Sequence, residues 1–276
     1  PPISISVSLN DEAIHPTVGF DGTDYLVVWA GARSGTAEVY AARVATDGTV
    51  LDPGGIQITT GGDPKIRMLG LAFDGTNFLV IWRDTGDRIK VARSSTGGGS
   101  PQSRDAAAGT QITGGSSYYP AVAFGETHYL VVWHDSRNVA ATGWDVYGAR
   151  VGTDGAVLPA DAGGFLICDD PEHQEHTTVG FDGTNYLVAW YDWRPDGNVL
   201  FGSTYGARVR PDGTVLDDPA FLISDRARGQ HPVRVSCDSG ASNCLVVWDS
   251  DHGDPVHWRQ TDIYARRVYT DGTLDR

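Results

Sequence analysis

Long apolar runs and basic clusters are both missing from this sequence. No apolar stretch approaches the roughly 18 to 20 residues that a membrane helix needs, and the N-terminus has neither the charged start nor the apolar core of a signal peptide. The 21 basic side chains are outnumbered by 35 acidic ones, so the formal net charge is −14. Nucleic acids and anionic membrane surfaces repel such a chain. We therefore expect neither as a partner, and we expect a soluble, already processed protein.

Methionine and cysteine are also scarce, with one Met and three Cys against 35 Gly, 11 Tyr and eight Trp. A chain rich in turn formers and aromatics favours short strands over helices. Hydrophobic residues make up 40% of the chain, which is enough to bury a sizeable core. We predict an all-β globular protein.

A Tyr/Phe-Leu-Val-x-Trp motif, with Cys in the first position of its last copy, recurs five times, and its tryptophans lie 51 to 58 residues apart. That spacing suits a four-stranded propeller blade. Each unit reads as an apolar strand, an Asp-Gly turn, the Trp strand, a strand ending in Ala-Arg-Val or a variant of it, and a fourth strand after a second turn. A β-sandwich does not readily explain five equivalent tryptophans. These are Trp29, Trp82, Trp133, Trp190 and Trp248.

The fifth repeat stops before its fourth strand, whereas residues 3–9 alternate as that strand should. We therefore predict one domain over residues 1–276, a five-bladed β-propeller with four antiparallel strands per blade. The N-terminal strand would complete blade five and close the ring, which removes unpaired edges. The expected blades cover about 14–60, 66–114, 118–169, 174–225, and 230–276 together with 3–9.

Two motifs inside the repeats carry a family resemblance. Trp-x-Asp-x-Arg ends at Arg137 and Arg194, and Tyr-Gly-Ala-Arg-Val occupies 147–151 and 205–209. These repeats resemble those of large secreted bacterial β-propeller proteins. The resemblance spans nearly the whole chain and implies the architecture and a secreted or extracellular bacterial location. It implies no particular reaction.

The cysteines bear on the compartment. Cys237 and Cys244 flank the first hairpin turn of the fifth repeat. A disulfide across this hairpin would place the protein in an oxidising compartment, and two free buried thiols are the alternative. Cys168 takes the place of Ser224 in the next repeat, and we expect it to be a small core residue.

One position in each repeat should surround the mouth of the central channel. It opens the innermost strand and holds His15, Met68, Tyr119, His176 and His231. Three histidines around one opening could bind a divalent metal, since imidazole suits Zn, Cu, Fe or Ni. The alternative is that each His only caps its strand by bonding to backbone.

The loops after the tryptophans supply the other candidates. Asp135 with Arg137 and Asp192 with Arg194 lie two residues apart, so each pair could bind a ligand or form an ion pair that shapes its own loop. The long loops of blades three to five add Trp144, Trp193 and Trp258. Indole faces stack on sugar rings, although these side chains could also pin the loops internally.

Three functions follow from these features. The first is a monomeric secreted module that binds a glycan or another small polar ligand on the loop-rich face over blades three to five. The second is a metal-dependent hydrolase or lyase in which the three histidines hold the ion and Asp135 or Asp192 is the general base. A metal-free glycosidase is less attractive, because we find no acids on the inner strands. The third is a structural spacer in a larger surface protein. The glycan site would comprise Tyr119, Asp135, Arg137, Trp144, Asp192, Trp193, Arg194 and Trp258.

Overall fold

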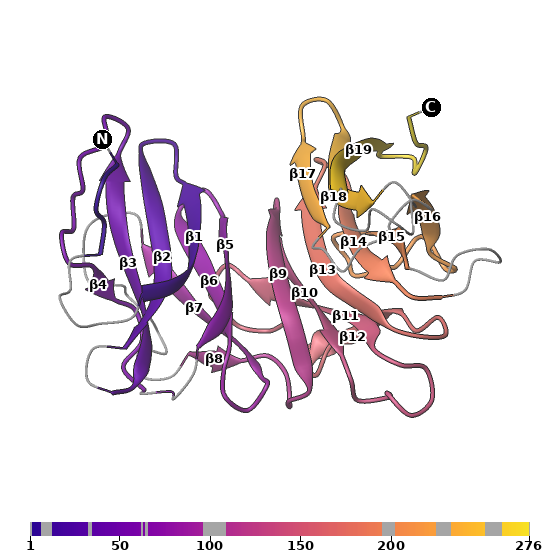
Figure 1. Ribbon diagram of the computed structural model, residues 1–276, viewed down its shortest axis with the longest axis horizontal. Helices are drawn as coiled ribbons and strands as arrows, with labels where there is room; N and C mark the ends of the chain where they lie inside the picture. The colour runs from indigo at the N-terminus through magenta and orange to yellow at the C-terminus, as the bar shows by residue number, and fades with distance from the viewer. Residues whose placement is uncertain are drawn as a thin grey trace.

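The chain folds almost entirely into antiparallel β-structure (Figure 1). The computed structural model describes residues 2–6, 13–32, 35–61, 63, 66–95, 109–194, 202–224, 233–251 and 261–275. Within these ranges the helical content is one 3₁₀ turn, η1 (Pro159–Asp161). No helix in this part of the chain is long and apolar enough to cross a membrane.

Five sheets follow one another along the chain, four with four strands and the last with three. The first contains β1 (Ala13–Phe20), β2 (Asp24–Ala32), β3 (Ala37–Ala45) and β4 (Ile56–Gln57). The second contains β5 (Arg67–Phe73), β6 (Asn77–Arg83), β7 (Ile89–Ser95) and β8 (Thr110–Gln111). The third contains β9 (Ser117–Gly125), β10 (His128–Asp135), β11 (Asp145–Gly152) and β12 (Phe165–Cys168). The fourth contains β13 (Gln174–Phe181), β14 (Tyr186–Asp192), β15 (Ser203–Val209) and β16 (Phe221–Ser224). The fifth contains β17 (Arg234–Asp238), β18 (Asn243–Asp251) and β19 (Thr261–Tyr269).

Asp-Gly turns fix the register of the inner hairpins. In the first sheet the Asp21 carboxylate accepts the backbone N–H groups of Thr23 and Asp24, and Gly22 has a φ of 96° that other residues rarely adopt. The turn leaves Phe20 opposite Tyr25. In the fifth sheet the equivalent pair is Cys237 and Cys244, and the predicted disulfide between them is confirmed.

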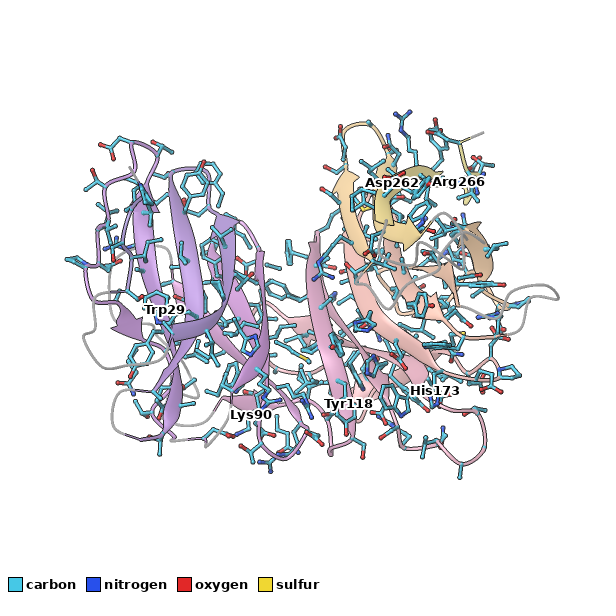
Figure 2. The ribbon with its side chains drawn as sticks, viewed as in Figure 1. Trp29, Lys90, Tyr118, His173, Asp262 and Arg266 are labelled. Atoms are coloured by element: carbon cyan, nitrogen blue, oxygen red, sulfur yellow. A yellow bond between two sulfur atoms is a disulfide. The ribbon has the colours of Figure 1, made fainter. Side chains whose placement is uncertain are left out.

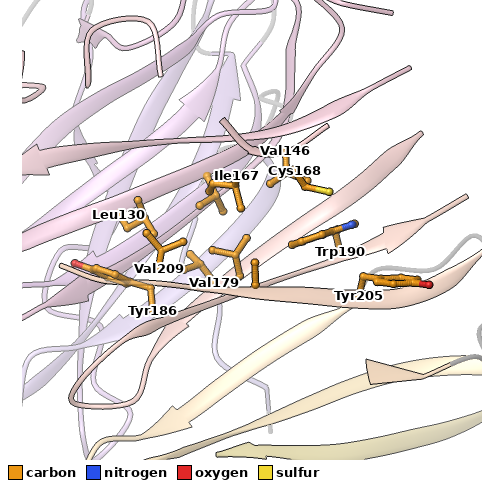
Figure 3. Close-up of a cluster of buried hydrophobic side chains, with 12 residues drawn as sticks. Leu130, Val146, Ile167, Cys168, Val179, Tyr186, Trp190, Tyr205 and Val209 are labelled. Carbon is orange, nitrogen blue, oxygen red and sulfur yellow. The ribbon is translucent and has the colours of Figure 1, made fainter. Parts of the chain in front are cut away.

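The core lies between successive sheets, because each Trp strand is buried on both faces. In β14, Tyr186, Val188 and Trp190 pack toward the third sheet (Figure 3), whereas Leu187 and Ala189 pack toward the fifth. Such two-sided burial explains why these strands are nearly continuous apolar runs rather than alternating ones. Cys168 lies in the same core, as expected, and burial raises the pKa of its thiol.

The structure does not confirm the predicted ring closure. Residues 2–6 form no strand on the fifth sheet. Ile5 instead packs near Trp29 and Tyr40 of the first sheet. Among the described residues, the inner strands contact one another in the order β1, β5, β9, β13, β17, and β17 makes no comparable contact with β1. The apolar face of the first sheet thus attracts the N-terminal segment.

Candidate functional site

A cavity of about 700 Å³ lies between the five inner strands and is the candidate site. Its lining includes the four described mouth residues that the repeat predicts, His15, Met68, Tyr119 and His176. All four have left-handed backbone, with φ between 49° and 56°, and each sits at a β-bulge. Bulges of this kind turn a side chain away from its normal strand direction, and strained backbone often accompanies a functional site.

A group of aromatic rings and imidazoles adjoins the cavity where the third and fourth sheets meet. The Tyr119 and His176 rings meet edge to face with centroids 4.2 Å apart. Behind them, His134 stacks on Trp144 at 4.9 Å, and Trp144 also stacks on Tyr118 and contacts His173. Figure 2 shows Tyr118 and His173 at the lower end of the molecule in this view.

His134 is the fully buried member of this group. Its Nδ1 accepts the backbone N–H of His176 at 3.2 Å, so its position is coupled to the bulge. Burial, with a smaller contribution from the neighbouring His176, lowers the pKa of His134 to about 3. The imidazole is therefore neutral at physiological pH, and its unprotonated Nδ1 can accept the hydrogen bond that the backbone N–H of His176 donates.

Glu175 is an acid on the inner strand β13, which corrects our reading that the inner strands carry none. Its carboxylate oxygen lies 3.8 Å from Nε2 of His176, and the side chain is only 21% exposed. Burial raises the pKa of Glu175, and the nearby His173 and Trp193 offset only part of that effect. The signal was available in the sequence, because this Glu directly precedes the mouth residue of its repeat.

The two Asp-Arg pairs form ion pairs within their own loops, as the alternative to a ligand site predicted. Asp135 has no exposed surface, and its carboxylate accepts the Trp133 indole N–H at 2.9 Å and two bonds from the Arg137 guanidinium. Burial alone would raise the pKa of Asp135, but these donors hold it below its usual value. Arg137 in turn covers the ring of Tyr147 at 4.0 Å. This carboxylate offers no surface to a ligand.

The fourth sheet repeats the arrangement. Asp192 is fully buried and accepts the Trp190 indole N–H at 2.8 Å and bonds from Arg194, which lies over the Tyr205 ring. The Trp-x-Asp-x-Arg motif is thus a structural device that joins the Trp strand to its own loop.

The loop tryptophans are packed internally where the structure describes them. Trp144 stacks on Tyr118 and His134, and Trp193 meets Tyr191 edge to face at 5.4 Å within the core between the fourth and fifth sheets. Trp258 lies outside the described residues. The alternative interpretation, in which these side chains pin the loops, fits both described positions.

The metal prediction rests on three histidines, of which two are described. His15 and His176 line the cavity, and His231 lies outside the described residues. No group of three or more metal-ligating side chains occurs in the part of the chain that the structure covers. In the fifth sheet the register places Cys237 at the position equivalent to Phe20.

Comparisons with known proteins identify the fold. No family model and no curated protein matches the chain. Among solved structures, a thermostable family-43 glycoside hydrolase is 12% identical, with 99% of this chain and 95% of that chain covered and a TM-score of 0.53. An α-L-arabinofuranosidase from Lactobacillus brevis is also 12% identical, with 94% and 92% covered and a TM-score of 0.51. The β-propeller domain of the Trilobed protease from Pyrococcus furiosus, described as having an open velcro topology, is 10% identical, with 96% and 70% covered and a TM-score of 0.52.

At this identity the likeness shows that the chain has the β-propeller fold. The repeats correctly predicted that fold. Our first functional interpretation, a glycan-binding module without catalysis, is wrong by the same comparison, because the neighbours are mainly glycoside hydrolases.

Proposed function

We propose that this chain is a five-bladed glycoside hydrolase whose reaction takes place at the mouth of the central cavity, with Glu175 as general acid. The observation that carries the proposal is the partly buried Glu175 carboxyl, whose pKa is raised by burial and which lies 3.8 Å from an imidazole of the cavity wall. A raised carboxyl pKa keeps the proton available for transfer near neutral pH. The glycosidases of similar fold support the substrate class.

The chemistry divides between two kinds of group. Glu175 donates its proton to the glycosidic oxygen while the bond from that oxygen to the anomeric carbon breaks. Water adds to the anomeric carbon and gives up its proton to a base. His15 and His176 both line the cavity, and a neutral imidazole can accept that proton. Tyr119, which is 37% exposed, offers a ring face to the sugar.

Aryl glycosides of arabinofuranose and xylopyranose test the proposal. We expect the wild type to release the aryl group and Glu175→Gln to lower kcat by about 10²- to 10⁴-fold, the usual contribution of a positioned proton donor. Activity should fall as pH rises through the raised pKa of Glu175, because only the protonated carboxyl is the acid.

Glu172→Gln is the matched control, since Glu172 is an exposed acid three residues earlier on the same chain segment. It should keep wild-type activity. Full activity in a folded Glu175→Gln variant, or a wild type that cleaves neither neutral nor anionic glycosides, would overturn the assignment.

A further inference from the structure

Arg234 breaks the repeat at one position of the inner strands. The strand pairing places it opposite Val247, as Thr17 lies opposite Val28 and Gly70 opposite Ile81. A side chain at this position points toward the following sheet, because a Cβ on Gly70 would lie 3.5 Å from Val122 of the third sheet. The other four sheets have small residues here, namely Thr17, Gly70, Ala121 and Thr178.

Arg234 is exposed, and among the described strands β17 has its main contacts with β18, β13 and β14 only. Nη1 of Arg234 donates to the carbonyl of Val233 at 3.0 Å, and the guanidinium makes no ion pair with any carboxylate among the described residues. Elsewhere in this acidic chain most strand and loop arginines do pair with carboxylates. These are Arg43, Arg83, Arg88, Arg137, Arg150, Arg194, Arg208 and Arg267.

The cavity that Arg234 lines has the opposite character to the rest of the protein. None of the described residues that line it is an Asp or a Glu, and its basic side chains are Arg234, His15 and His176. Glu175 is not part of that lining, although its carboxylate lies 3.8 Å from Nε2 of His176. The chain as a whole carries a net charge of −14. An anion approaching the molecule is therefore repelled in general, and in this cavity it meets the Arg234 guanidinium with no carboxylate among the described lining residues.

We propose that the cavity binds a sugar carrying an anionic group, a carboxylate or a sulfate ester, and that Arg234 holds that group. The inference rests on the proposed glycoside hydrolase function and specifies its substrate class. The planar guanidinium matches such an oxyanion with two parallel hydrogen bonds, which a point charge cannot provide. A neutral oligosaccharide can accept hydrogen bonds from the guanidinium, but it does not neutralise its charge.

The test measures binding rather than turnover, so that it is independent of catalysis. Isothermal titration on a Glu175→Gln background compares trigalacturonate, a sulfated trisaccharide and xylotriose. We expect one of the anionic probes to bind at least tenfold more tightly than xylotriose, with a preference that weakens as salt is added. Trigalacturonate and the sulfated sugar distinguish the two sources of negative charge.

Arg234→Gln should remove the preference, a loss of tenfold or more, since a hydrogen bond to a charged group is worth about 1.5 to 3 kcal/mol. Arg234→Lys should retain part of it. Arg210→Gln makes the same charge change at an exposed turn beyond the far end of β15 and should bind as wild type. Equal binding of all three probes, or a preference that survives Arg234→Gln, would overturn the inference.

The two proposals fail in different ways. Glu175-dependent cleavage of neutral glycosides without anionic preference would refute the anionic substrate and leave the hydrolase. Arg234-dependent binding of an anionic sugar that the wild type never cleaves would support the ligand class and refute the hydrolase.

Discussion

The buried imidazole of His134 ties the stability of this protein to pH. Burial lowers the pKa of His134 to about 3, whereas an unfolded His titrates near 6.5. Between these values the unfolded chain binds a proton that the folded chain does not, so the free energy of unfolding decreases as the pH is lowered. The contribution of His134 is fully present above pH 6.5 and is lost progressively toward pH 3, at up to about 1.4 kcal/mol per pH unit.

Urea denaturation between pH 7 and pH 4 checks this prediction. We expect the His134→Gln variant to be less stable at pH 7 and to lose stability less steeply on acidification than the wild type. His128→Gln, at the opposite end of the same strand β10, should show the same pH dependence of stability as the wild type. Parallel pH profiles for the wild type and His134→Gln would contradict the prediction.

The Asp-Arg motif shows what residue spacing could have revealed. Residues two apart on a strand point to the same face, so Asp135 necessarily lies beside the indole of Trp133. The spacing therefore indicated a bond within the repeat more directly than a ligand site. What the sequence could not show was burial, because Asp135 lies on the face of β10 that packs against the second sheet and becomes inaccessible only once these sheets come together.

At the scale of single elements, the bulge that opens each inner strand is a conformational requirement as well as a source of site residues. His15 has a φ of 53° and an exposed side chain. Substitutions there therefore change the cost of the left-handed backbone with little loss of side-chain packing. Asn tolerates left-handed backbone, whereas a β-branched residue does not. We expect His15→Val to lower the free energy of unfolding by about 1 to 2 kcal/mol relative to His15→Asn, measured by urea denaturation. Equal stability of the two variants would show that the bulge relaxes.

Local patterns predicted the hairpins well and the termini poorly. The Asp-Gly turns set their register through neighbours in the chain, as at Asp21, and the Cys237–Cys244 disulfide follows from the same hairpin. The position of Ile5 instead depends on which distant apolar face is uncovered, and no local signal encodes that. The cavity mouth was predictable from the repeat, whereas the raised pKa of Glu175 depends on the burial of its carboxyl in the folded protein.

At the scale of the whole molecule, the first and last sheets each have one face that resembles the faces buried between successive sheets. Leu26, Leu79, Leu130 and Leu187 occupy one position of the Trp strand and are 0 to 4% exposed, whereas Leu245 at the same position of the fifth sheet is 45% exposed. On the facing side of the first sheet, Phe20 and Tyr25 are 45% and 41% exposed. The two terminal faces thus have the composition of a sheet contact that the described residues do not make.

Truncating equivalent leucines measures whether the ring stays open in solution. Leu187→Ala should lower the free energy of unfolding by about 2 to 5 kcal/mol, the usual cost of emptying a core site. Leu245→Ala should cost less than about 1 kcal/mol, because nearly half of that side chain already contacts water. Urea midpoints with unchanged slopes give both values. If Leu245→Ala costs as much as Leu187→Ala, the fifth sheet is covered in solution, and the first sheet is the surface whose composition matches that contact.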